Sequence, residues 1–271
     1  LVLFSLITVG YSANALGGAG GPLAVLIIAI VAAELGKAVS KETKVDILVT
    51  PLVTIFAGVG LSMLIAAPIG AAASQVGTLI MWATEQAPLV MGILVSVIVG
   101  VALTLPISSA AICAALGLTG LAGGAAVAGC CAQMVGFAVM SYKENGVGGL
   151  VSQGLGTSML QMGNIIKNPR IWIAPTLASA ITGPLATCLF HFEMNGAAVS
   201  SGMGTCGLVG QIGVYTGWVS DIAAGTKAAI TPMDWAAMVL LCFVLPAVLS
   251  VVFCEVERKL GWIKDGDLKL N

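Results

Sequence analysis

Long apolar runs fill this sequence, and they constrain its fold more than any motif does. Residues 87–105 and 234–254 are mostly Val, Leu, Ile and Ala, and each comes close to the roughly 20 residues that a helix needs to cross a bilayer. Only 8% of the residues are charged, against about 25% in an average soluble domain. The sequence therefore predicts an all-α integral membrane protein.

Apolar segments recur along the chain, with shorter or more polar pieces between them. Segment 69–86 is less apolar, so we expect an interfacial stretch or a half-helix there. Pro106 leaves 107–118 too short to cross alone. Gly120 and Gly124 have GxxxG spacing, which favours close backbone packing. The segments expected to reach through the membrane are 1–14, 20–38, 47–67, 87–105, 120–142, 171–190 and 234–254.

The glycine-rich stretch 190–218 concentrates polar side chains in an apolar chain. It holds the only histidine, His191, and its seven glycines are expected to interrupt any regular helix. Broken backbone at membrane depth is tolerated only where it is buried in protein or lines a wet cavity. Polar side chains beside such breaks are typical of transporter substrate sites. The predicted binding residues in this stretch are His191, Glu193, Asn195, Ser200, Ser201, Thr205 and Gln211.

Basic residues orient the chain, because they gather on the cytoplasmic side of a membrane protein. Arg170 and Arg258 both mark cytoplasmic segments. Between them, segments 171–190 and 234–254 each cross the membrane once. Segment 191–220 then has to enter and leave on one side, so we predict a re-entrant hairpin; only Lys227 argues against it. The charges that mark cytoplasmic segments are Lys37, Lys41, Lys44, Lys143, Lys167, Arg170, Arg258 and Lys259.

Other residue types exclude several function classes. A net charge of −1 argues against nucleic acid as a partner. The seven cysteines have no CxxC or Cys/His spacing and are expected to be small buried hydrophobes. No Walker A or GxGxxG motif stands between a strand and a helix, and one histidine offers no catalytic triad. We therefore expect no metal, no cofactor and no catalytic chemistry in this chain.

Two runs carry a resemblance to a known family: NPRIWIAPTLASAITGPLATC at 168–188 and EMNGAAVSSGMGTCGLVGQIG at 193–213. The chain resembles EIIC membrane proteins of the bacterial sugar phosphotransferase system, in the group that includes the perfringolysin O regulator type. The similarity covers nearly the whole chain and is most specific over 153–217. It implies about ten helical membrane segments, including half-helices and re-entrant hairpins, in a homodimer that works by alternating access.

The same resemblance implies different roles for three parts of the chain. Residues 1–142 would form the scaffold and dimer contact, 143–254 the substrate part, and 255–271 a cytoplasmic tail. The Gly-Ile-Thr-Glu motif of glucose-type EIIC proteins is absent from this sequence, and its nearest counterpart is His191 with Glu193. No EIIA or EIIB domain is attached, so phosphoryl coupling would need separate proteins.

Glu193 is the strongest single candidate, because inserting an acid at membrane depth costs roughly 2.5–3.5 kcal/mol. The alternative is an acid at the wet interface that caps a helix. His191 suits hydrogen bonding to a sugar hydroxyl, carrying a proton, or a structural contact with Glu193. On a regular helix residues i and i+2 do not face one another, so a shared site requires irregular backbone.

The remaining candidates are neutral. Amides and hydroxyls both donate and accept hydrogen bonds, so they suit a sugar, but they equally satisfy freed backbone groups. Gln133 lies mid-span, where interhelical hydrogen bonding is the alternative. Asn164 belongs to the amphipathic segment 143–170, whose polar residues recur at roughly helical spacing and face either the pathway or the headgroups.

The first hypothesis is an EIIC-type permease in the bacterial cytoplasmic membrane, with its C-terminus in the cytoplasm. It would move a small polar solute, a sugar or polyol, and would work with separate EIIA and EIIB proteins. The alternative is a membrane-embedded regulator that senses a ligand at the same site without net transport. An intramembrane enzyme acting on lipid has little support, since Glu193 is the one acid placed at depth.

Overall fold

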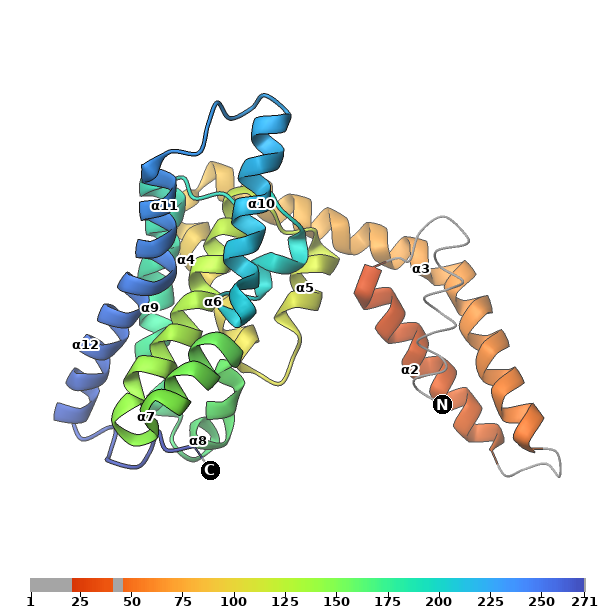
Figure 1. Cartoon of the computed structure of the whole chain (residues 1–271). Helices are drawn as coiled ribbons and strands as arrows, with labels where there is room; N and C mark the ends of the chain where they lie inside the picture. Colours follow the sequence, from red (N-terminus) through yellow and green to blue (C-terminus); the bar gives the residue numbers. More distant parts are fainter. Residues whose placement is uncertain (1–20, 41–45, 271) are drawn as a thin grey trace. The chain divides into compact units, whose positions relative to one another are not determined.

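The computed structural model describes residues 21–40 and 46–270, and Figure 1 shows that these are almost wholly helical. The chain divides into two compact units. One comprises Leu1–Gly77 with Ala114–Leu116, and the other comprises Thr78–Cys113 with Gly117–Asn271. No strand forms within the described ranges, where an isolated β-bridge joins Gly120 to Met194. The predicted all-α class is confirmed; the expected segment 1–14 lies outside the described residues.

The first unit is built on α2 (Gly21–Val39) and α3 (Asp46–Gln86), which share a small core around Ile28 and Ala66. Helix α3 runs for 41 residues without a break. The predicted separation of 47–67 from 69–86 is therefore wrong. Thr84 in the second half is satisfied by the helix itself, since its Oγ1 donates to the Ile80 carbonyl at 2.7 Å.

After α3 the helices are short and are joined by 3₁₀ and π-helical turns. The α-helices are α4 (Pro88–Thr104), α5 (Ser109–Leu116), α6 (Gly120–Met140), α7 (Tyr142–Val151), α8 (Met162–Lys167), α9 (Ile173–Pro184), α10 (Val209–Ala223), α11 (Pro232–Val239) and α12 (Leu245–Lys259). The shorter turns are η1 (Ser152–Gly156), η2 (Ser158–Gln161), η3 (Pro169–Trp172), η4 (Leu185–Leu189), η5 (Ala198–Gly202), η6 (Cys206–Leu208) and η7 (Leu240–Val244).

Helix α6 is the centre of the second unit, and nearly every residue in it is buried. Helices α4, α9 and α12 pack around it. The approach is close because the contact positions lack side chains: a methyl group on Gly129 would overlap the Ser96 carbonyl of α4. Ser96 Oγ in turn donates to the Ser179 carbonyl of α9 at 2.8 Å. Small residues and interhelical hydrogen bonds thus hold three backbones together, as is usual in lipid.

Four stretches of the described residues are long and apolar enough to cross a membrane. The outer face of α12 shows why they need lipid: Val248, Val252 and Val256, four residues apart, are 54%, 52% and 49% exposed. An apolar stripe of this kind suits contact with lipid tails rather than water. The four stretches are Asp46–Gln86, Gly120–Met140, Pro169–Leu189 and Pro232–Lys259.

Replacing Gly129 with alanine tests the packing around α6. The added methyl has to push α4 away, and overpacking of this kind costs roughly 1–3 kcal/mol. Thermal or denaturant unfolding in detergent should therefore show lower stability for Gly129→Ala. The matched control is Gly163→Ala in α8, where an added methyl meets nothing within 4 Å. Equal stability of the two variants would contradict the close contact between α4 and α6.

Candidate functional site

A pocket of about 580 Å³ lies where the segment after η4 meets the C-terminal end of α10 and the start of α11. Its volume is in the range of small-molecule sites, which is roughly 300–1,000 Å³. Trp218 and Phe190 contribute apolar walls. The polar residues that line it are His191, Glu193, Asn195, Asp221, Thr226, Lys227 and Asp234.

Irregular backbone presents three of these side chains on one face. Residues 191–195 form no helix, and His191 has a positive φ of 43°. Phe192 and Met194 are 3% and 0% exposed, and Phe192 forms part of the pocket wall, whereas His191 and Glu193 are exposed and Asn195 is half-buried. Side chains two residues apart thus lie on one side of this segment, which a regular helix would not allow.

Helix α6 holds the non-helical segment 191–195 in place. Gly120 and Met194 exchange both backbone hydrogen bonds, each at 3.0 Å. A methyl group on Gly124 would overlap the Phe192 carbonyl. The close packing predicted for this GxxxG pair is therefore confirmed at Gly124, where the absent side chain admits the backbone that carries Glu193.

Helix α10 closes the segment from the other side. A methyl group on Gly217 would lie 2.8 Å from the Asn195 backbone nitrogen, and one on Gly213 would overlap the Ser200 side chain. The prediction that glycines prevent a regular helix is thus wrong from Val209 onward. There the glycines form a smooth helix face against which the segment packs. Before that point the prediction is correct, since Gly204 and Gly207 both have a φ of 53° in irregular backbone.

The charges in the pocket form two connected groups. The Asn195 amide donates to Glu193 Oε2 at 3.0 Å and to Asp221 Oδ2 at 2.9 Å. Lys227 Nζ lies 2.7 Å from Asp234 Oδ1 and 5.4 Å from the centre of the Trp218 ring. With His191 neutral, three carboxylates and one ammonium leave a formal charge of −2 in the pocket. Such a field disfavours anionic solutes.

Four of the predicted binding residues lie beneath the pocket rather than in it. All four are buried, three of them hydrogen-bonded through their side chains to neighbouring segments. Ser201 donates to the Leu118 carbonyl at 2.6 Å, Thr205 to the Gly154 carbonyl at 2.5 Å, and Gln211 to Cys131 Sγ at 3.2 Å, while Ser200 packs against α10. These three hydrogen bonds anchor the glycine-rich stretch to its neighbours. A structural role of this kind is the alternative to solute binding that the sequence left open.

The other two predicted residues belong to different polar networks. Gln133 is 0% exposed and fully engaged between helices: its Oε1 accepts from Trp172 Nε1 at 3.0 Å, and its Nε2 donates to Thr176 Oγ1 at 3.2 Å. Asn164 donates to the Lys269 carbonyl at 2.9 Å. It therefore contacts the C-terminal tail, far along the chain from the pocket residues.

The pocket residues that were not among the predicted binding residues include Trp218, Asp221, Lys227 and Asp234. Asp221, Lys227 and Asp234 carry charge in a chain with few charged residues. Their rarity is the sequence feature that could have identified them as candidate site residues. They come together because the loop 224–231 reverses the chain between α10 and α11. Among the residues that the structure describes, no three His, Cys, Asp or Glu side chains are arranged to hold a metal ion.

Comparison with known proteins gives one match. The family model described as phosphotransferase system, EIIC matches residues 3–270, nearly the whole chain. No curated protein and no solved structure matches significantly.

Substituting Asn195 tests the two hydrogen bonds by which its amide links the carboxylates of Glu193 and Asp221. Asn195→Asp would place a third carboxylate between Glu193 and Asp221 and should destabilise the fold at pH 7 more than Asn195→Ala does. Both variants lose the amide, so their difference reports charge repulsion. That difference should shrink at high ionic strength, because salt screens repulsion between solvent-accessible charges. Thermal unfolding at low and high salt measures it; identical behaviour of the two variants would contradict these hydrogen bonds.

Proposed function

We propose that this chain, which belongs to the EIIC family of the phosphotransferase system, is a permease component that binds a neutral sugar or polyol in the pocket around Glu193. The single observation behind the proposal is the row of His191, Glu193 and Asn195. They line one pocket of about 580 Å³ from a segment of non-helical backbone. Broken backbone lining a polar cavity is how membrane transporters build their sites.

The chemistry of the pocket fits a solute with many hydroxyl groups. Carboxylates only accept hydrogen bonds, whereas Asn195 and Lys227 donate them. A hydroxyl does both, so a polyol can satisfy each kind of group in turn. The formal charge of −2 supports a neutral solute over a sugar phosphate or a carboxylic acid.

The position of the pocket supports an outward-facing site. It lies at the end of the bundle where α10 joins α11, whereas α7, α8 and the tail lie at the opposite end (Figure 1). Apart from Lys227, which lines the pocket, the basic residues of the second half gather at that opposite end, and this favours a cytoplasmic position for it. These basic residues are Lys143, Lys167, Arg170, Arg258, Lys259, Lys264 and Lys269.

Alternating access and assembly complete the proposal. Residues 143–254 would carry the solute while residues 1–142 form the scaffold and the contact of a homodimer. Segment 191–220 would act as the re-entrant hairpin, and residues 255–271 would face the cytoplasm. Phosphoryl transfer would be carried out together with EIIA and EIIB proteins.

Ligand-induced thermal stabilisation tests the site. Purified protein is screened against sugars, polyols, sugar phosphates and organic acids. A ligand at 100 times its dissociation constant stabilises the folded state by about 2.7 kcal/mol. We expect stabilisation by a neutral polyol, its loss in Glu193→Gln, and no response to the phosphorylated form. Glu85→Gln, an exposed acid outside the pocket, is the matched control.

Flux into proteoliposomes then separates transport from sensing. A solute that stabilises the protein should also cross the membrane, and Glu193→Gln should reduce both. Binding without flux would support the ligand-sensing regulator instead. Stabilisation that survives in Glu193→Gln would move the binding site away from this pocket.

A further inference from the structure

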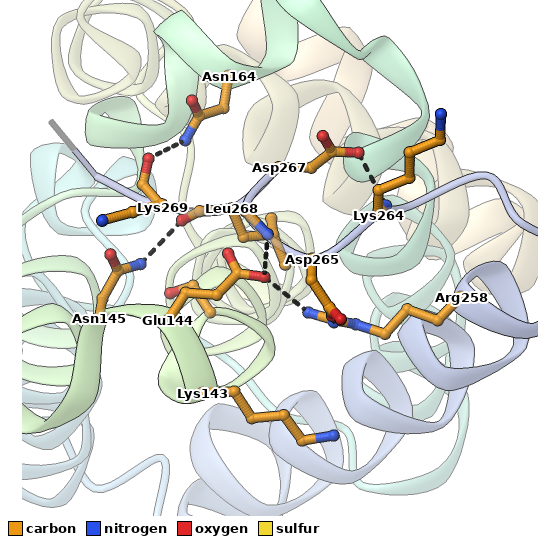
Figure 2. A network of polar contacts seen from close by, with 12 residues as sticks. Lys143, Glu144, Asn145, Asn164, Arg258, Lys264, Asp265, Asp267, Leu268 and Lys269 are labelled. Atoms are coloured by element: carbon orange, nitrogen blue, oxygen red, sulfur yellow. Dashed lines mark hydrogen bonds and ion pairs between the residues drawn. The ribbon is translucent and has the colours of Figure 1, made fainter.

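The chain after α12 folds back onto the bundle instead of leaving it. The Trp262 amide donates to the Glu257 carbonyl at 2.9 Å, and Gly261 and Gly266 adopt positive φ values of 72° and 99°. These left-handed turns let a short segment reverse direction twice. Residues 261–270, called the tail from here on, thereby lie against α7, η2 and α8 (Figure 2).

Three side-chain amides recognise the backbone of the tail. Asn145 donates to the Leu268 carbonyl at 2.8 Å and accepts from the Leu270 amide at 2.8 Å. Gln161 donates to the same Leu268 carbonyl at 2.9 Å, and Asn164 donates to the Lys269 carbonyl. The hydrogen bonds that these three side chains make to the tail all end on its main-chain atoms, so the three amides, called the amide cleft, hold the tail by its backbone.

Behind the cleft runs a chain of buried amides. Gln161 Nε2 donates to Gln153 Oε1 at 2.9 Å, and Gln153 Nε2 donates to Ser141 Oγ at 2.7 Å. Both glutamines are 0% exposed. The tail covers the outer end of this row, so its departure would open a polar path into the bundle from that end.

A charged clasp fastens the base of the tail. Arg258 pairs with Glu144 at 3.1 Å and with Asp265 at 2.8 Å, and the Gly266 amide donates to the same Glu144 oxygen at 3.2 Å. The Asp265 side chain is 99% exposed. The Arg258–Glu144 pair joins α12 to α7 and is largely buried, with side chains 14% and 10% exposed, so the ion pair that reaches the tail is the one with Asp265. An ion pair with an exposed partner contributes little to stability, typically 0–1 kcal/mol, so Asp265 orients the tail without fixing it permanently.

The tail has few apolar anchors. Ile263 and Leu268 enter a core cluster with Phe137 and Ile171, and they are 3% and 0% exposed. The tail also carries four charged side chains, Lys264, Asp265, Asp267 and Lys269, and Asn168 donates to its Trp262 carbonyl and to Asp267 Oδ2, each at 2.9 Å. An open space of about 450 Å³ remains between the tail and Asn164. Opening would release these polar groups, which water solvates well, together with the two buried apolar side chains. Local opening of such segments is far easier than global unfolding.

We propose that the tail is a reversible latch. In its docked state it occupies the amide cleft and closes the end of the bundle opposite the pocket; in its released state it exposes the row Asn164, Gln161 and Gln153. The proposal concerns this end alone and does not depend on what the pocket around Glu193 binds.

Thiol accessibility in the full-length protein tests the latch. Leu268→Cys introduces a thiol at a position that docking buries completely. The internal references are native: Cys130 is 0% exposed in the bundle centre, and Cys188 is exposed. The protein in detergent or nanodiscs is treated with a maleimide, and peptide-resolved mass spectrometry gives each rate.

A latch predicts an intermediate rate. The thiol at position 268 should react at least about tenfold more slowly than Cys188 and at least about tenfold faster than Cys130. A rate equal to that of Cys130 would make the tail a permanent part of the fold. A rate equal to that of Cys188 would mean that it does not dock. Either result overturns the proposal.

A second variant links release to the cleft. Adding Asn145→Ala removes two hydrogen bonds to the tail, so the rate at position 268 should rise about tenfold while that of Cys130 stays unchanged. Glu85→Gln, which changes an exposed side chain of α3 away from the tail, should leave both rates unchanged. Hydrogen exchange of residues 260–270 in the unsubstituted protein gives an independent measure and should exceed the exchange of α6. Equal exchange would also overturn the latch.

Discussion

Backbone contact without intervening side chains is the interaction on which this structure depends. In lipid, helices gain little by hiding apolar surface from one another, so they associate through close packing and hydrogen bonds. Helix α6 meets this condition along its length, with Gly124 against the Phe192 carbonyl and Gly129 against Ser96. The same helix therefore both holds the bundle together and sets the position of the segment that carries Glu193.

The two ends of the second unit use that central helix differently. At one end its N-terminus pairs with Met194 and leaves a hollow lined by charges. At the other, Phe137 and Met140 near its C-terminus pack in the cluster that receives Leu268 of the tail. Between them Gln133 is satisfied by neighbouring helices. The middle of α6 is thus closed by hydrogen bonds, while polar groups lie at both of its ends.

The sequence was enough to predict the all-α membrane class and the limits of several helices, because the hydropathy of a segment depends on that segment's own residues. Helices α4 and α6 begin and end within two residues of their expected limits. It failed where a residue's role depends on its neighbours in space. A glycine weakens an isolated helix, yet in α10 Gly213 and Gly217 are the contact surface of a regular one.

Some residues of the candidate site could likewise be predicted from sequence, and others could not. His191, Glu193 and Asn195 are adjacent in sequence, so one polar cluster pointed to all three. Asp221 and Asp234 reach the pocket only through the reversal between α10 and α11, which no local pattern encodes. The alternation of exposed and buried side chains over 191–194 carries a further consequence. Because this segment is held by the backbone pairing of Met194 with Gly120, deleting one residue ahead of His191 would shift which side chains turn inward, bringing Phe192 and Met194 outward and burying the acid. The polarity of the hollow thus depends on where this segment lies along its contact with α6, and a shift of one residue would change it more than any single substitution.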